Sequence, residues 1–436
     1  MVGPSAVTRP WHRRPPGGAA SPRRRPAHAG AAASRGRRVL RSAAVLAPAA
    51  ALALIAAAPA AADVSQTVTL EASQAVTRGA EDEARAAGSG RAELDLRSTG
   101  SRFVRGRLQL RALVATGDPT ADLEVPRAFV KARFPLGEES YAHLTAGRAR
   151  LTWGDGAFYN AGDTVFGALG TNPDLTGETI RDETTWLAAA FVPLGRFSFV
   201  EPVVLIPLPT ETPDGTVEAA PAHDTSAGVR IQGKLGQIKS EASYLFRGTE
   251  SYHQPAVSLQ GNLFLDWYAG ATTRVPGPDS QLPWDTGAET AREEAAASFG
   301  LLHIAQGSSG QSLTIRLEGL ARPWKDWSER SAGAAAGNAG DGAVAAAAAG
   351  GAAEPYGLEL FGEVIWQPAQ SLQFYLRNVV SPIDTSALFV PGAAWTPYDG
   401  LTFSLFAALQ AGEVSDVYGW ERADGAAVVT TMGYVY

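Results

Sequence analysis

The sequence predicts an all-β fold, a single antiparallel transmembrane β-barrel of about 14 strands (range about 12–16) that follows a cleaved signal peptide. The first observation is an alternation with a period of two, in which apolar residues such as Leu313, Ile315 and Leu317 are separated by polar ones. Successive side chains of a strand point to opposite faces, so such a segment has one dry and one wet face. A soluble sandwich would bury its dry faces together, whereas a membrane barrel turns them to lipid and its wet faces to a lumen. The second observation, a leader at the N-terminus, favours the barrel.

The first 62 residues have the three parts of a secretory signal peptide. Residues 1–38 are rich in Arg, Pro and Gly and contain no acidic residue, and residues 43–58 are almost wholly apolar. Three alanines then stand before Asp63 as a small-residue cleavage site. This order of basic, apolar and small residues predicts a signal peptide over 1–62 and an outer-membrane barrel domain over 63–436.

The basic part of this leader is unusually long. One hypothesis is that translation starts near Val39, so that residues 1–38 are a misplaced start. A precursor peptide that begins well upstream of Val39 would contradict this hypothesis.

Removal of the leader makes the chain more acidic. Residues 1–62 hold 10 Arg and no Lys, Asp or Glu, so the exported chain carries 27 basic and 44 acidic residues, a formal net charge of −17. Such a chain is a poor nucleic-acid binder by charge alone. The absence of cysteine excludes disulfides, thiolate metal sites and a cysteine nucleophile.

Beyond the leader, no apolar run has the length of a spanning helix, so the chain is expected to cross the membrane as strands. Seventeen segments are candidate strands, in chain order: 64–76, 91–97, 102–115, 126–134, 141–153, 185–192, 196–206, 227–236, 239–248, 256–270, 294–305, 311–322, 356–367, 371–380, 387–396, 400–410 and 425–436. About 374 residues at roughly 10 per strand, plus turns and loops, suit about 12–16 strands. Some segments are therefore expected to be luminal or halves of one strand.

The connections between these segments are of two kinds. Short ones with turn residues, 367–370 and 396–400, are expected to be periplasmic turns. Long polar or low-complexity ones, 209–224, 273–292 and 327–354, are expected to be outer loops.

The last strand has one alternating face that stops at the final residue. This face consists of Val428, Thr430, Met432, Tyr434 and Tyr436. It resembles the C-terminal signal by which Gram-negative outer-membrane barrels are recognised by the barrel assembly machinery, although that signal usually ends in Phe. The resemblance implies that Tyr434 and Tyr436 belong to an assembly signal in a protein of the Gram-negative outer membrane. The alternative is an ordinary edge strand.

Residues 147–167 contain the one motif-like stretch. A Gly-Arg strand runs into Trp153-Gly154-Asp155-Gly156 and then into a segment with Asn160 and Asp163. The stretch resembles a pattern in DUF1302-type and alginate-export-like porins, over about 40 residues in all, but it lacks the Asn-Pro-x-Asp form of those families. The resemblance implies an outer-membrane barrel and identifies no solute.

Two interpretations of this stretch compete. In the first, Arg148, Arg150, Asp155 and Asp163 face the lumen and form a constriction with paired charges, as charged rings do in selective pores. In the second, the glycines and the Asn and Asp residues shape a loop that folds into or caps the barrel, and the Arg residues pair locally. Both can hold together.

Further candidate pore-lining residues follow from the alternation. Arg105, Arg107 and Arg111 share one strand face, and on the lipid side each would cost about 2–4 kcal/mol at mid-depth, so they are expected to point inward. Arg316 and Glu318 lie on the wet face of their strand. The alternative for the arginines is that neighbouring acids neutralise them and the lumen is plugged.

The function expected from these features is a porin-like channel for small hydrophilic solutes. The alternatives are a structural or adhesive barrel with a closed lumen and, with less support, an outer-membrane enzyme or a soluble periplasmic β protein. None of the four histidines beyond the leader has a zinc-ligand spacing, and no P-loop or dinucleotide fingerprint occurs, so we expect no catalytic, metal or cofactor site. The expected partners are outer-membrane lipid, the assembly machinery and solutes; the oligomeric state stays open.

Overall fold

The structure, a computed structural model, describes most of the chain beyond the predicted leader. The described residues are 64–78, 84–98, 102–115, 121–137, 140–171, 173–207, 210–211, 217–218, 220–277, 291–307, 310–325, 327–328, 356–412, 416–418 and 426–436. The predicted signal peptide and the proposed late translation start lie outside these residues. So do most of the loop 327–354 and parts of the other two predicted outer loops.

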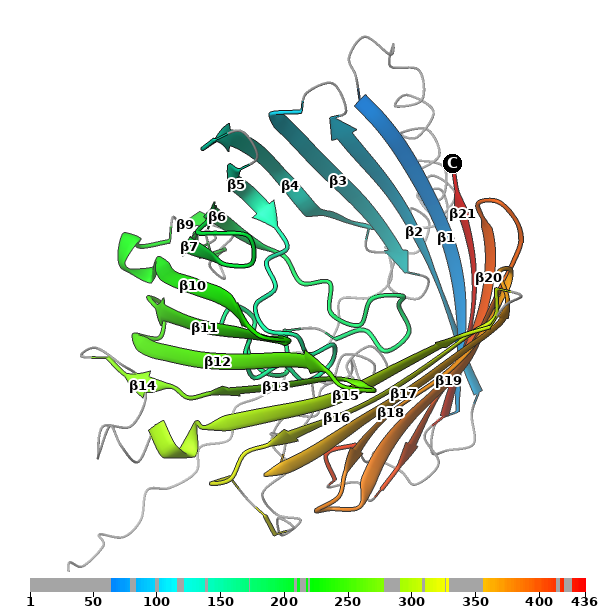
Figure 1. Cartoon of the computed structure of the whole chain (residues 1–436). Coiled ribbons are helices and arrows are strands. Elements are labelled where there is room, and N and C mark those ends of the chain that lie inside the picture. The colour runs from blue at the N-terminus through cyan, green and yellow to red at the C-terminus, as the bar shows by residue number, and fades with distance from the viewer. Residues whose placement is uncertain are drawn as a thin grey trace, which may run out of the picture. The chain divides into compact units, whose positions relative to one another are not determined.

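Within the described part of the chain, 18 antiparallel strands form one closed β-barrel (Figure 1). The strands are β1 (Val64–Arg78), β2 (Ala84–Ser98), β3 (Val104–Ala115), β4 (Ala121–Pro135), β5 (Tyr141–Ala149), β6 (Thr185–Pro193), β7 (Phe199–Leu205), β10 (Ser226–Leu235), β11 (Ile238–Arg247), β12 (Tyr252–Asn262), β13 (Asp266–Thr272), β15 (Ala296–Gln306), β16 (Ser312–Ala321), β17 (Leu358–Ala369), β18 (Leu372–Ser381), β19 (Ser386–Tyr398), β20 (Leu401–Ala411) and β21 (Ala426–Val435). Each strand pairs with the next along this series, and β21 pairs with β1 to close the barrel. The short β14 (Val275–Pro276) pairs with β12, and β8 (Thr210–Glu211) pairs with β9 (Val217–Glu218) apart from the barrel.

The expected strand number of about 14 is wrong, and so is its range. Every one of the 17 candidate segments overlaps a barrel strand, so the expectation that some are luminal or are halves of one strand is wrong, and only residues 150–153, at the end of segment 141–153, lie inside the barrel. Segment 256–270 covers two strands, β12 and β13, because the turn between them carries Leu263, Phe264 and Leu265 in place of polar turn residues. An apolar turn has no sequence signal that separates it from a strand.

The outer face of the barrel is apolar. On β20, for example, Phe403, Leu405 and Leu409 are 37%, 51% and 42% exposed. On β21, Met432 and Tyr434 are 49% and 44% exposed on the face predicted from the alternation. A sheet that closes on itself leaves no unpaired edge in lipid. The wall therefore has the two properties that a membrane-spanning barrel needs, an apolar outer face and a closed sheet. Among the described residues, no helix is long and apolar enough to cross a membrane.

The connections divide between the two ends of the barrel. Residues 236–237, 370–371 and 399–400 form short turns at the end where β1 begins and β21 stops, and the long connections lie at the other end. At the short-turn end Tyr436 exchanges two backbone hydrogen bonds with Val68, at 2.8 and 2.9 Å. In barrels of this kind the short turns are periplasmic and the long loops are outside.

Candidate functional site

The connection between β5 and β6, residues 150–184, runs inside the barrel (Figure 1). We call it the constriction loop. It has no regular secondary structure, yet Trp153, Tyr159 and Ala161 have no exposed surface. Close turns shape it: Gly154 has a φ of +70°, and a Cβ on Gly156 would collide with the Tyr159 carbonyl oxygen. The predicted loop that folds into the barrel is present at this position.

Backbone groups of such a loop need partners once they are buried, and wall carboxylates provide them. Glu318 of β16 accepts hydrogen bonds from the backbone N–H groups of Ala157, Phe158 and Tyr159, at 2.9, 2.8 and 2.7 Å. The Tyr268 hydroxyl donates to the same carboxylate. Glu318 is 4% exposed, so it anchors the loop to the wall from the interior.

Other wall acids bind the loop at its first turn. Glu241 of β11 accepts the Gly154 N–H at 2.8 Å, and Glu201 of β7 accepts the indole N–H of Trp153 at 3.1 Å. Arg230 of β10 bridges these two carboxylates. The loop is therefore attached to several neighbouring strands.

Cations hold carbonyl groups farther along the loop. Arg377 of β18 donates to the carbonyl oxygens of Leu175 and Gly177, at 2.8 and 2.6 Å, and to Glu363 at 2.8 Å. Arg316, one of the predicted pore-lining residues, also pairs with Glu363, at 2.9 Å. These contacts place the second half of the loop against β16–β18.

Apolar packing accompanies the polar contacts. Phe158 and Tyr159 of the loop lie in a buried cluster with Phe361 and Val379 of the wall, and the rings of Phe158 and Phe361 are stacked with centroids 4.7 Å apart. The contact between loop and wall thus has a core of its own.

Inside the loop, Asp163 links its two halves. Its carboxylate is 1% exposed, accepts the N–H groups of Val165 and Phe166 at 2.9 and 3.2 Å, and pairs with Arg181 at 2.9 Å. Burial raises the pKa of Asp163 to about 6, against the lowering effect of the Arg181 guanidinium. Asp163 is placed as a structural link within the loop.

The inner face of β2–β4 carries a row of charges. Arg107 pairs with Asp95 at 2.8 Å, and Arg111 pairs with Glu93 at 3.1 Å, so neighbouring acids neutralise these two arginines. Arg105 stands opposite Lys131 in the β3–β4 register.

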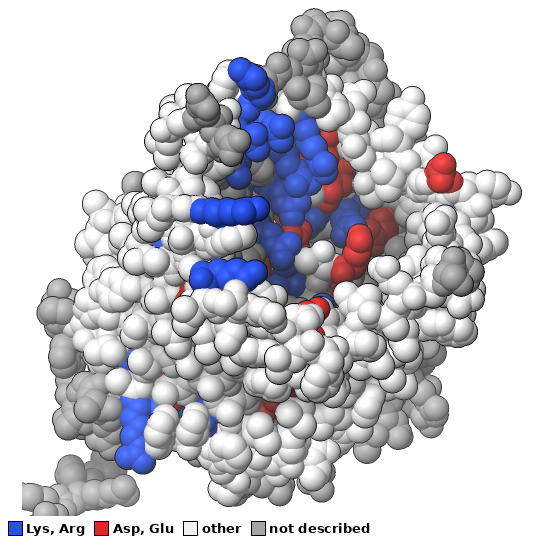
Figure 2. Space-filling model, in the orientation of Figure 1, with Lys and Arg blue, Asp and Glu red and all other residues white. Residues whose placement is uncertain are grey.

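Figure 2 shows a hollow in the side of the molecule turned to the viewer. Lys and Arg side chains gather on one side of this hollow, and Asp and Glu side chains lie on its other side. Near the start of the constriction loop, Arg150 lies 3.6 Å from Asp182, and Arg127 of β4 pairs with the same carboxylate. Arg148 donates to the Thr184 hydroxyl at 3.2 Å. Asp182 therefore links Arg150 to β4, whereas the contact of Arg148 is with the end of the constriction loop.

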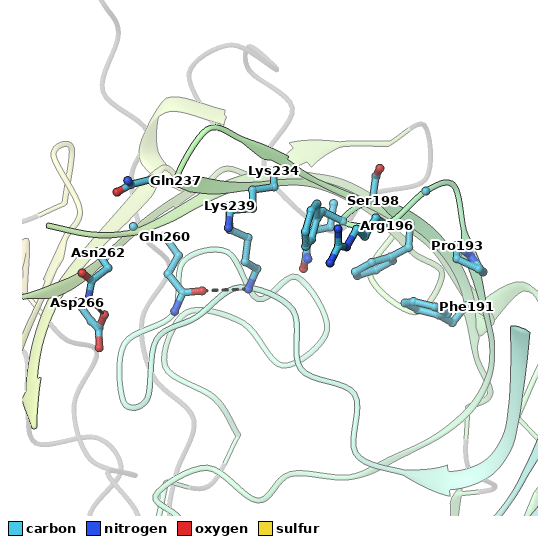
Figure 3. Close-up of a pocket in the computed structure, with 15 residues that line it drawn as sticks. Phe191, Pro193, Arg196, Ser198, Lys234, Gln237, Lys239, Gln260, Asn262 and Asp266 are labelled. Carbon is cyan, nitrogen blue, oxygen red and sulfur yellow. Dashed lines mark hydrogen bonds between the residues drawn. The ribbon is translucent and has the colours of Figure 1, made fainter. Parts of the chain in front are cut away.

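A pocket of about 600 Å³ opens near the short-turn end, lined by strands β6, β7 and β10–β13 (Figure 3). The rings of Phe191 and Phe199 lie 4.5 Å apart on one side of it. On the other side the ammonium group of Lys239 lies 2.5 Å from Asp155 of the constriction loop and 3.4 Å from Gln260. The predicted Asp155 thus ties the loop to the pocket wall.

Several of these residues were not predicted from the sequence. Glu201 and Arg377 are the single charged residues of β7 and β18, and that isolation is the signal by which they could have been found. Glu241 and Glu359 share their strands with other charged residues, so no such signal marks them. Their partners could not be inferred, because the loop residues that they contact lie 48 to 202 positions away in the sequence.

Comparison with known proteins gives the fold. No family model and no curated protein matches the chain. Among solved structures, OccAB4 of Acinetobacter baumannii is similar with a TM-score of 0.50 and 9% identity, over 86% of this chain and 98% of that chain. OccK11 (OpdR) and OccK8 (OprE) of Pseudomonas aeruginosa have TM-scores of 0.49 and 0.48, with 10% and 11% identity over 86% of this chain and 96% and 98% of theirs. At these identities the similarity concerns the fold alone. The closed wall and the apolar outer face give the chain the architecture of a membrane-spanning β-barrel, the fold that it shares with OccAB4.

Proposed function

We propose that the chain is a diffusion channel for small hydrophilic solutes and that the constriction loop narrows its lumen. The observation that carries this proposal is the set of cations on the inner wall near the short-turn end. Among the described residues, Arg105, Lys131 and Arg133 have no ion-pair partner. Charged groups without partners need water, since burial of an unpaired charge is very costly. A water-filled lumen along β3 and β4 satisfies them.

The position of the constriction loop supports the same proposal. Its anchors Glu201, Glu241 and Glu318 lie on β7, β11 and β16, and the loop reaches β4 only at its end, where Asp182 pairs with Arg127. A loop held against one part of the wall leaves the other part free to line a passage. Loops folded into a barrel in this way narrow a channel without closing it.

The predicted site residues take different roles in this proposal. Arg105, Arg107 and Arg111 line the passage, whereas Asp155, Asp163 and Glu318 hold the loop that bounds it. The similarity to DUF1302-type and alginate-export-like porins stays a prediction, as do the assembly machinery and the solutes as partners.

Single-channel recording in a planar bilayer tests the proposal. The refolded chain without residues 1–62 is added after heat-modifiable migration on a gel has verified that it is folded. Discrete conductance steps are expected. The lack of steps from verified, inserted protein would reject the channel and favour the alternative, a structural or adhesive barrel whose lumen is closed.

The lining role of Arg105 has its own test. Arg105→Gln removes a cation that no acid neutralises, so the chloride-to-potassium permeability ratio is expected to fall by a factor of roughly two. Arg274→Gln, which removes a cation paired with Glu294 at 3.7 Å, serves as the control of equal charge. Equal ratios for the two variants would contradict the assignment of Arg105.

A further inference from the structure

One buried carboxylate is shared by two loops. Glu359, at the start of β17, has no exposed surface. Its Oε2 accepts a hydrogen bond from the hydroxyl of Tyr159 in the constriction loop, at 3.3 Å, and another from the hydroxyl of Tyr418, at 2.5 Å. Tyr418 belongs to the long connection between β20 and β21 at the outer end of the barrel. The two loops therefore meet at a single side chain of the wall.

A second set of contacts fixes the outer segment 416–418 to the wall. The Val417 N–H donates to Asp384 Oδ2 at 2.8 Å, and the Tyr418 N–H donates to Ser386 Oγ at 3.2 Å. Ser386 Oγ in turn donates to Asp384 Oδ1 at 2.8 Å. The segment is thus tied at its backbone by Asp384 and Ser386 and at its side chain by Glu359.

The outer segment also shares the apolar core of the constriction loop. Tyr418 packs against the buried cluster that contains Phe158, Tyr159, Leu175 and Ile180 of the loop. Movement of Tyr418 would remove both a packing neighbour and the second donor of the carboxylate that holds Tyr159.

Both phenols are suited to act as permanent donors. Burial raises the pKa of Tyr159 and of Tyr418 well above the ordinary value for tyrosine, and the nearby Glu359 carboxylate raises both further. Loss of either hydroxyl leaves a fully buried carboxylate with one donor fewer, which is costly. The two hydrogen bonds are therefore expected to support each other.

We propose that residues 416–418 form a strap that seats the constriction loop through Glu359, so that this strap controls the width of the channel. Control of the channel width by the strap rests on the proposed channel function. Seating of the loop by the strap is a structural property and can be measured without conductance.

The absence of cysteine makes a site-specific test possible. Ala168, a partly buried loop residue that packs against the same cluster, is replaced by cysteine to give a single labelling site. The rate of maleimide labelling of folded Ala168→Cys in lipid vesicles is then compared with and without Tyr418→Phe. A rise of at least threefold is expected, because the strap no longer holds the loop. Tyr159→Phe is expected to give a similar rise, and the two together less than the product of the single effects.

Tyr252→Phe is the matched control, since it removes a hydroxyl from another buried tyrosine that does not contact Glu359. Ser386→Ala is a second variant that loosens the backbone tie and leaves the phenol in place. Unchanged labelling in both Tyr418→Phe and Ser386→Ala, with heat-modifiable migration intact, would overturn the strap. Faster labelling in a protein that never conducts would retain the strap and reject the channel. Faster labelling with larger conductance steps supports both.

Discussion

Glu318 shows how one side chain can position a loop. Three consecutive N–H groups converge on it, and no cation among the described residues forms an ion pair with it. A carboxylate can accept all three hydrogen bonds, whereas an amide presents an NH₂ group to at least one of the donors.

Glu318→Gln is therefore expected to loosen the constriction loop. Hydrogen bonds to charged groups contribute about 1.5–3 kcal/mol each, so a loss of roughly 2–3 kcal/mol in the seating of the loop is expected. The variant should give larger and noisier conductance steps with the barrel still folded. Glu124→Gln, at an acid whose side chain is 47% exposed, is the control. Indistinguishable traces from the two variants would mean that Glu318 does not position the loop.

Asp163 gives the loop a pH dependence. Its folded pKa of about 6 lies above its ordinary value of 3.8, so the folded chain binds more protons than the unfolded chain between these pH values. The free energy of unfolding therefore falls as the pH rises through this window and is level above it. The pKa shift of Asp163 corresponds to a fall of about 3 kcal/mol in this free energy.

Asp163→Asn is expected to remove this contribution, because the amide oxygen can still accept the N–H groups of Val165 and Phe166 but does not titrate. The measurement is the heat-modifiable transition of both proteins from pH 3.5 to 7.5, taken as a difference so that other acids cancel. A difference that stays constant across pH 4–6 would show that Asp163 does not titrate there.

At the scale of elements, each strand has a lipid face and a luminal face, one residue apart. Leu405→Arg places a charge on the outer face of β20 and is expected to cost about 2–4 kcal/mol if the position is near mid-depth. Ser404→Arg places the same side chain on the inner face of the same strand, where it can be hydrated. Urea titrations of refolding in lipid vesicles should give Leu405→Arg a clearly lower free energy of unfolding than Ser404→Arg. The reverse order would mean that the faces of β20 have been exchanged.

The alternation of residues predicts these faces well, because it is a local property of the chain. All 17 candidate segments overlap barrel strands, and the faces of β3, β16 and β21 agree with the alternation. The strand number was wrong for two local reasons: the apolar turn at 263–265, and strands as short as β7 and β13, with seven residues each. An average strand length cannot reveal either.

The site was predicted less completely than the wall. The loop near Asp155 and Asp163 could be placed by its glycines and its Asn and Asp residues, because turn chemistry is local. The contact between Glu318 and residues 157–159 spans about 160 positions, and no periodicity indicates it. Sequence reasoning therefore placed Glu318 on the wet face but could not identify what it binds.

At the scale of the whole molecule, the barrel depends on one seam. The strand β21 pairs with β1 from Arg78 to Thr69, and Tyr436 extends the seam to Val68. A closed barrel has no edge only while this seam is intact.

Deletion of residues 434–436 is expected to shorten the seam and to remove the predicted assembly signal. The deleted chain should show little heat-modifiable, folded protein in outer membranes, whereas Tyr436→Phe should assemble normally. Refolding of the deleted chain in vesicles separates the two causes: success there with failure in cells indicates a lost signal, and failure in both indicates a lost seam. Normal assembly in cells would contradict the predicted role of these residues.

Many of the contacts between the wall and the constriction loop are made by the main chain of the loop, whose amide groups bind Glu318 and whose carbonyl groups bind Arg377. Main-chain groups are common to all residues, so at positions such as Ala157 the side chain is not what the wall selects. The side chains that the loop presents to the passage can therefore be changed by substitution, while the barrel wall continues to hold the main chain of the loop in the same position.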